Sequence, residues 1–199
     1  MNHARRNLLL QALLVFVVAL LPRLVGSGHF LTADEKQWVG RGVEFVRALR
    51  EFRFNDTLQT THPGIPTLWI SGLTSSVVAR LGHQPFSFDV LLPFLVASRI
   101  PIAVLNSLLV AGVFVAARPL IGREVALLGA LAIALDPFLI GHSKIVHVDA
   151  LLAGFTALSL LLLLRAEAGD RTGRAETWAL PASAVTGALA ILSKLPGLI

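Results

Sequence analysis

Five long apolar runs constrain this chain more than any other feature of its sequence. They lie at about 8–25, 99–117, 125–140, 148–164 and 178–199, and each is rich in Leu, Ala and Val. A helix needs about 20 mostly apolar residues to cross the hydrocarbon core of a bilayer, and within lipid only a helix pairs all its own backbone polar groups. The sequence therefore predicts an all-α fold, a multi-pass membrane bundle of about five spans.

Composition favours a membrane protein over a soluble one. Of the 199 residues, 55% are hydrophobic and 15% are charged, which is too apolar for an ordinary soluble domain. The net charge is +5, but the basic residues are spread over short loops, so we expect no nucleic-acid partner. The chain has no cysteine, which excludes disulfides and thiolate metal sites.

Basic residues occupy every second loop. They precede the first run and follow the second and the fourth, at Arg5, Arg6, Arg118, Arg123, Arg165, Arg171 and Arg174. Because cytoplasmic loops carry the excess of Lys and Arg, we expect an integral membrane protein with a cytoplasmic N-terminus, in the plasma membrane if the source is prokaryotic. The first run lacks a small-x-small cleavage site, which indicates an uncleaved anchor.

The polar stretch at about 26–89 is then extracytoplasmic, and we expect the functional site there. Thr32 and Glu35 fit a capping box, which predicts that a helix starts at this point. Apolar residues then recur at three-to-four spacing opposite basic ones, which is typical of a helix on the membrane surface. A turn with two prolines at 61–66 precedes a second amphipathic helix at about 67–81.

Two adjacent acids, Asp34 and Glu35, open the first of these helices. A general base must be ionised, and the positive end of the helix dipole keeps Asp34 ionised. One base is sufficient if the donor is a phosphorylated sugar, because a lipid phosphate leaves without a protonating acid. Both acids are therefore candidate catalytic residues, and helix capping is the structural alternative for Glu35.

Ionisable residues also gather between the third and fourth runs, and such groups at membrane depth tend to line functional cavities. We interpret some of these, together with Arg99, as ligands of a donor phosphate: Lys144, Arg99 and His142. We expect three further residues to contact the acceptor or line the cavity: His62, His147 and Asp149. Snorkelling of Arg99, capping by Asp149 and a turn role for His62 are the structural alternatives.

Three further features complete the set of candidate residues. Asp136-Pro137 is expected to break the third span, with Asp136 satisfying the freed backbone groups. Lys194 lies within the last run and either snorkels or is functional. We expect no cofactor and no metal, because no ligand spacing is fixed; a divalent ion near Asp34, Glu35, His62 and Asp149 is the alternative.

The order of these pieces on the membrane topology is distinctive. They are the Asp34-Glu35 pair, Gln59-Thr60-Thr61-His62-Pro63-Gly64, Leu135-Asp136-Pro137, Ser143-Lys144 and Asp149-Ala150-Leu151-Leu152. Together they resemble the GT-C superfamily of membrane glycosyltransferases, in particular glycosyltransferase family 39, the dolichyl-phosphate-mannose protein mannosyltransferases and their bacterial relatives.

This resemblance implies an inverting enzyme that uses a polyprenyl-phosphate-linked sugar in the membrane lipid, on the extracytoplasmic face. The acceptor would be a hydroxyl of a protein, a lipid or a glycan, and the first acidic motif would be catalytic. Family members carry further spans, so 1–199 is expected to be the N-terminal part of a GT-C transmembrane domain. A transporter or lipid-binding membrane protein and a non-catalytic fragment of the enzyme are the alternatives.

Overall fold

The computed structural model describes residues 3–171 and 178–198, and this part of the chain is helical with no strand. The main helices are α1 (His3–Leu24), α2 (Ala33–Arg50), α3 (Ile65–Leu81), α4 (Leu91–Ile121), α5 (Arg123–Leu135), α6 (Pro137–Ser143), α7 (Asp149–Arg171) and α8 (Ala179–Ser193). Short 3₁₀ turns are η1 (Phe54–Thr57), η2 (Phe88–Val90) and η3 (Leu195–Leu198). The predicted all-α fold is confirmed.

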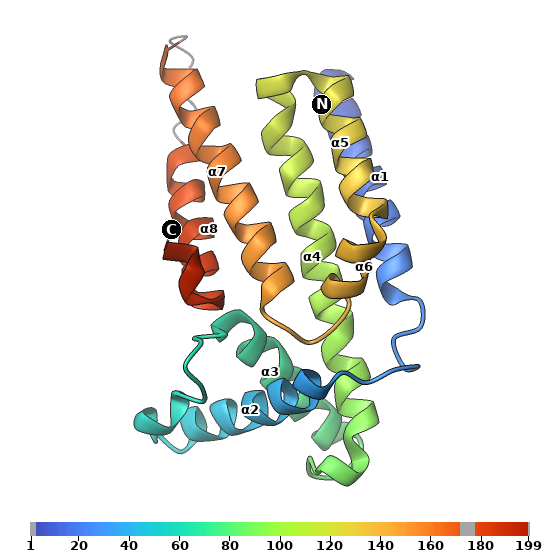
Figure 1. Ribbon diagram of the computed structural model, residues 1–199, viewed down its shortest axis with the longest axis vertical. Helices are drawn as coiled ribbons and strands as arrows, with labels where there is room; N and C mark the ends of the chain where they lie inside the picture. The colour runs from blue at the N-terminus through green and yellow to red at the C-terminus, as the bar shows by residue number, and fades with distance from the viewer. Residues whose placement is uncertain (1–2, 172–177, 199) are drawn as a thin grey trace.

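The apolar helices form a bundle, and α2 and α3 lie across one of its ends (Figure 1). Among the described residues, α1, α4 and α7 are long and apolar enough to cross a membrane, and α5 with α6 makes a fourth span if the bent pair counts as one. The apolar helix α8 is shorter, with 15 residues. This agrees roughly with five spans. Arg174 and Ile199, which belong to the predicted third basic loop and last span, lie outside the described residues.

The second span is longer than the predicted 99–117. Helix α4 extends over Leu91–Ile121 and contains Pro101 and Pro119. Prolines are tolerated inside membrane helices because neighbouring groups satisfy the backbone positions that they free. The added turns at the start of α4 pack against α2 and α3. Arg99 follows these turns on α4.

The third span is broken at Asp136-Pro137, as the sequence predicts. Helices α5 and α6 are bent by 63° relative to each other. Asp136 caps α6, because its Oδ1 accepts a hydrogen bond of 2.8 Å from the N–H of Leu139. The bend leaves the carbonyl oxygen of Ala134 without its helical partner, and Nη1 of Arg23 donates to this oxygen at 2.9 Å. The break thus creates a polar position at the end of α1.

Helices are present at both places where the sequence predicts them in this stretch, as α2 and α3. Helix α2 is amphipathic as predicted, whereas α3 has no distinct polar face. They cross where two glycines meet: a Cβ at Gly42 would lie 2.0 Å from Oγ of Ser71, and one at Gly72 would lie 2.2 Å from the carbonyl oxygen of Gly42. The apolar face of α2 packs on α3, α4 and the loop before α7, in a core that includes Trp38, Val39, Phe45, Val46, Leu68, Phe94, Leu95, Val146 and Val148.

The turn at 61–66 docks this layer onto the end of α8. The N–H of Gly64 donates to the carbonyl oxygen of Ser193 at 3.1 Å. Gly64 has a φ of +60°, and a Cβ there would lie 2.4 Å from the ring of Trp38, so only glycine fits without strain. The turn therefore holds the start of α3 near the end of the chain.

Candidate active site

Glu35 and Arg99 form a buried ion pair where α2 meets α4. Nε and Nη2 of Arg99 donate to Oε1 and Oε2 of Glu35 at 2.7 and 2.6 Å, and the side chains are 0% and 1% exposed. Oε1 also accepts from the N–H of Val146 at 2.9 Å, and Oε2 accepts from the N–H of Thr32 at 3.1 Å. Burial by itself raises the pKa of Glu35, but these hydrogen bonds and the charge of Arg99 hold it below its ordinary value.

The capping box predicted for Thr32 and Glu35 is present. The carboxylate of Glu35 also accepts hydrogen bonds from two other segments, because Val146 lies in the loop before α7 and Arg99 lies in α4. Glu35 is therefore a junction for three parts of the chain, and it is closed to solvent.

Arg99 directs its other N–H groups at backbone carbonyls. Nη1 donates to the carbonyl oxygen of Ser27, and Nη2 donates to that of Phe30 at 2.7 Å. The Phe30 ring covers the guanidinium at 4.7 Å from its central carbon. Every nitrogen of Arg99 has a protein partner, so this geometry favours a positioning role over the phosphate-binding role expected from the sequence.

Asp34 is open to solvent although its neighbour is buried. Its side chain is 65% exposed, and its Oδ2 lies 3.7 Å from Nε2 of His147. Nδ1 of His147 lies 3.4 Å from Oδ2 of Asp149, and Oδ1 of Asp149 accepts from Nζ of Lys194 at 2.8 Å. Trp38 packs edge-on against the His147 ring, with the ring centroids 6.2 Å apart. Four residues from three separate segments thus form one chain of polar contacts that begins at Asp34.

The other candidate residues are not members of this chain of contacts. Nζ of Lys144 donates to the carbonyl oxygen of Val25 and lies 5.8 Å from the centroid of the Phe30 ring. His142 is exposed, and its ring lies 4.2 Å from that of Phe138, centroid to centroid. His62 is exposed in the turn before α3. Within the described ranges, no hydrogen bond or ion pair joins His62 to the other candidates.

A cavity of about 460 Å³ lies among α1, α4, α5, α6 and α7. Its walls are mainly aliphatic, from residues such as Leu109, Val110 and Ile133, whereas His142, Asp149 and Arg23 contribute charged or ionisable groups. An apolar cavity with a few polar groups is the usual form of a ligand site. This cavity borders the polar chain through Asp149.

Arg23 is the unexpected member of the cavity wall. It is 1% exposed, and it donates to Oγ of Ser143 at 2.6 Å and to the carbonyl oxygens of Ala19 and Ala134 at 2.7 and 2.9 Å. No carboxylate among the described residues pairs with it. Arg23 is not among the candidates predicted from the sequence, where its signal is a lone arginine in the last turn of an otherwise apolar span.

The described residues contain no group of three or more His, Asp or Glu side chains placed to hold a metal ion. Glu35, one member of the set considered for a divalent ion, is engaged by Arg99.

The bundle of apolar helices defines an integral membrane protein. The sequence profile of the family described as dolichyl-phosphate-mannose-protein mannosyltransferase matches residues 88–199. The chain belongs to this family, so it is of the GT-C membrane glycosyltransferase type. Asp34 and Glu35 precede the matched residues, whereas Arg99, Lys144 and Asp149 lie within them. No curated protein and no solved structure matches the chain.

Proposed function

We propose that this protein transfers a sugar from a polyprenyl-phosphate donor to an acceptor hydroxyl of a protein, a lipid or a glycan. Transfer would take place on the extracytoplasmic face, with inversion at the anomeric carbon. Family membership supports the reaction class. The observation that carries the proposal is the contrast between adjacent acids: Glu35 is 0% exposed and held by Arg99, whereas Asp34 is 65% exposed. Of the two, Asp34 is the carboxylate that an acceptor can reach.

In this proposal Asp34 is the general base. It takes the proton of the acceptor hydroxyl while the hydroxyl oxygen attacks the anomeric carbon. The bond from that carbon to the phosphate oxygen breaks on the opposite face, and its electron pair leaves with the polyprenyl phosphate. His147, at 3.7 Å from Asp34, orients the carboxylate, and Glu35 fixes the helix start from which Asp34 projects. Adjacent helical residues point about 100° apart, so the two acids have separate tasks.

The cavity among α1, α4, α5, α6 and α7 is the proposed site of the donor lipid. Its aliphatic walls suit an isoprenoid chain, and a buried guanidinium with no carboxylate partner, that of Arg23, suits a phosphate. His142 lines the same cavity, and Lys144 follows Ser143 of its wall. These three side chains would bind the phosphate, with Arg99 as a positioning residue. His147 and Asp149 would then lie on the acceptor side.

Transfer from polyprenyl-phosphate mannose, measured in membranes that contain the protein, tests the role of Asp34. Asp34→Asn keeps the shape and hydrogen bonding of the side chain but removes its basicity, so turnover should fall about 100-fold or more while donor binding is retained. Asp56→Asn is the matched control, because Asp56 is an exposed acid of the same layer that pairs with Arg53. Near-normal turnover in Asp34→Asn, or an equal loss of donor binding, would move the catalytic role to Glu35 or Asp149.

A further inference from the structure

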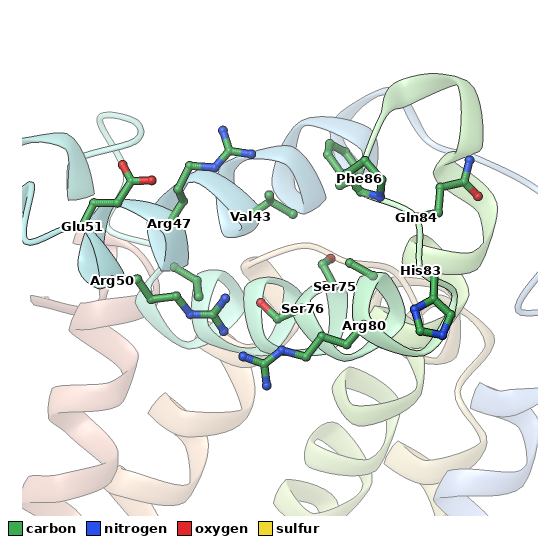
Figure 2. Close-up of a pocket in the computed structure, with 13 residues that line it drawn as sticks. Val43, Arg47, Arg50, Glu51, Ser75, Ser76, Arg80, His83, Gln84 and Phe86 are labelled. Carbon is green, nitrogen blue, oxygen red and sulfur yellow. The ribbon is translucent and has the colours of Figure 1, made fainter.

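A second pocket, of about 440 Å³, lies between the C-terminal halves of α2 and α3. Figure 2 shows Arg50 on α2 and Ser75, Ser76 and Arg80 on α3 among the residues that line this groove, whereas the side chain of Arg47 on α2 points away from α3. A helix rises 1.5 Å per residue, so Arg47 lies about 20 Å along α2 from Asp34. The groove is therefore separate from the candidate active site.

The groove carries positive charge that the protein does not neutralise. Arg50 and Arg80 form no ion pair with any described residue, whereas Arg47 is paired with Glu44 at 2.8 Å. The acid of the groove wall, Glu51, is already paired with Arg53 at 2.8 Å. Two guanidinium groups are thus available for an anion.

Ser75 supplies an independent sign of a ligand. Its neighbours on α3, Ser71, Thr74 and Ser76, each donate to the carbonyl oxygen four residues earlier, at 2.7 to 2.8 Å. Ser75 is 2% exposed, yet its Oγ has no hydrogen-bond partner. A buried hydroxyl without a partner is costly and rare in native proteins. An oxygen of a bound ligand, reached by a small rotation of the hydroxyl, would satisfy it.

The surface next to the groove indicates which kind of anion binds. Trp69, Leu73, Val77 and Leu81 are 42%, 47%, 55% and 79% exposed, and their spacing of four residues aligns them along one stripe of α3. Arg80 is three residues from Val77 and therefore borders this stripe. A helix with an exposed apolar stripe flanked by arginines is typical of a helix that lies in the interface of a bilayer.

We propose that the groove between α2 and α3 binds the phosphate headgroup of an anionic membrane lipid, which would anchor the extracytoplasmic layer to the bilayer. Arg50 and Arg80 contact the phosphate oxygens, Ser75 donates from the groove floor, and the acyl chains follow the apolar stripe of α3. The proposal concerns a second site and does not depend on the identity of the sugar donor or on the role of Asp34.

Native mass spectrometry of the full chain in detergent, with added phosphatidylglycerol or phosphatidylcholine, tests this proposal. We expect bound phosphatidylglycerol in preference to phosphatidylcholine, and millimolar inorganic phosphate should not displace it. The double variant Arg50→Gln/Arg80→Gln should weaken phosphatidylglycerol binding about 30-fold, because each arginine near a lipid surface contributes about fivefold. Ser75→Ala should weaken binding further without unfolding the protein, since its hydroxyl has no protein partner to lose.

The control removes the same charge from the same layer. Lys36 and Arg41 lie on α2 outside the groove, so Lys36→Gln/Arg41→Gln should keep the affinity for phosphatidylglycerol. Equal binding of both lipids, displacement by inorganic phosphate or by an acidic peptide, or an equal loss in the control and groove variants would overturn the proposal.

Discussion

The guanidinium of Arg99 donates two hydrogen bonds, 2.7 and 2.6 Å long, to the carboxylate of Glu35, and the two residues are 64 positions apart in the chain. This pair joins the start of α2 to the membrane helix α4, and it turns Glu35 away from solvent while Asp34 remains exposed. The difference in solvent exposure between Asp34 and Glu35 therefore originates in one tertiary contact.

Glu35→Gln should destabilise the protein strongly, because it leaves the Arg99 guanidinium buried without its counter-charge. Removing one partner of a buried ion pair costs about 3–5 kcal/mol. The free energy of unfolding in detergent, measured by denaturant titration, gives this loss directly. Glu35→Leu/Arg99→Met removes both charges and should recover much of the stability; a double variant no more stable than Glu35→Gln would contradict this account.

Stability should fall in acid because Glu35 is held charged. Its pKa in the folded protein lies below the unfolded value of about 4.3. The contribution is therefore fully present above pH 4.3 and is lost as the pH falls through the lower folded pKa. Thermal unfolding between pH 6 and pH 3 measures this effect. The same titration of Glu35→Gln should show a smaller decline, and an identical decline would mean that other acids cause it.

Gly42→Ala and Gly72→Ala should each separate α2 from α3. A Cβ at Gly42 would lie 2.0 Å from Ser71 Oγ, and one at Gly72 would lie 2.2 Å from a backbone oxygen. Overpacking of this kind costs about 1–3 kcal/mol. Gly129→Ala in α5 is the matched control, because nothing lies within 4 Å of its added Cβ and alanine favours helix. Hydrogen exchange of the α2 and α3 amides should increase in the first two variants and stay unchanged in the third.

Labelling with a membrane-impermeant maleimide tests the orientation of the chain. The sequence has no cysteine, so each introduced thiol is the sole target. Asp56→Cys, in η1 of the extracytoplasmic layer, should react in intact cells, and Glu124→Cys, at the connection of α4 and α5, should react only after permeabilisation. The reverse pattern would place the N-terminus outside the cell and the candidate site in the cytoplasm.

Lys144→Ala and His142→Ala should each weaken binding of the polyprenyl-phosphate donor, by about tenfold for Lys144, because a charge-assisted hydrogen bond to phosphate is lost. Equilibrium binding of a labelled donor in detergent gives the dissociation constants. Arg41→Ala is the control, since Arg41 lies on α2, where it contacts Gln37 and Trp38. Donor affinity that is unchanged in the single variants and in their double variant would remove both residues from the donor site.

Much of this protein could be predicted from the order of its residues. Apolar runs long enough for a bilayer must be helical there, so the helices and the break at Asp136-Pro137 follow from local chemistry. The capping box at Thr32 and Glu35 and the amphipathic helix that follows it are local in the same way, since each depends on residues at most one or two turns apart. The sequence also indicated the family that the profile match then established.

Only the tertiary structure decided which charged side chains are available. Arg99 resembled a phosphate ligand, but α4 brings it to Glu35 and to carbonyls of the loop after α1, which occupy its nitrogens. Arg23 was not among the residues predicted from the sequence, and the bend between α5 and α6 places it beside an apolar cavity. A charge excluded from water takes its partner from whatever the fold brings within about 3 Å, and these partners lie dozens of residues away. The sequence therefore shows which groups are ionisable. The tertiary packing determines which of them pair with other groups of the protein.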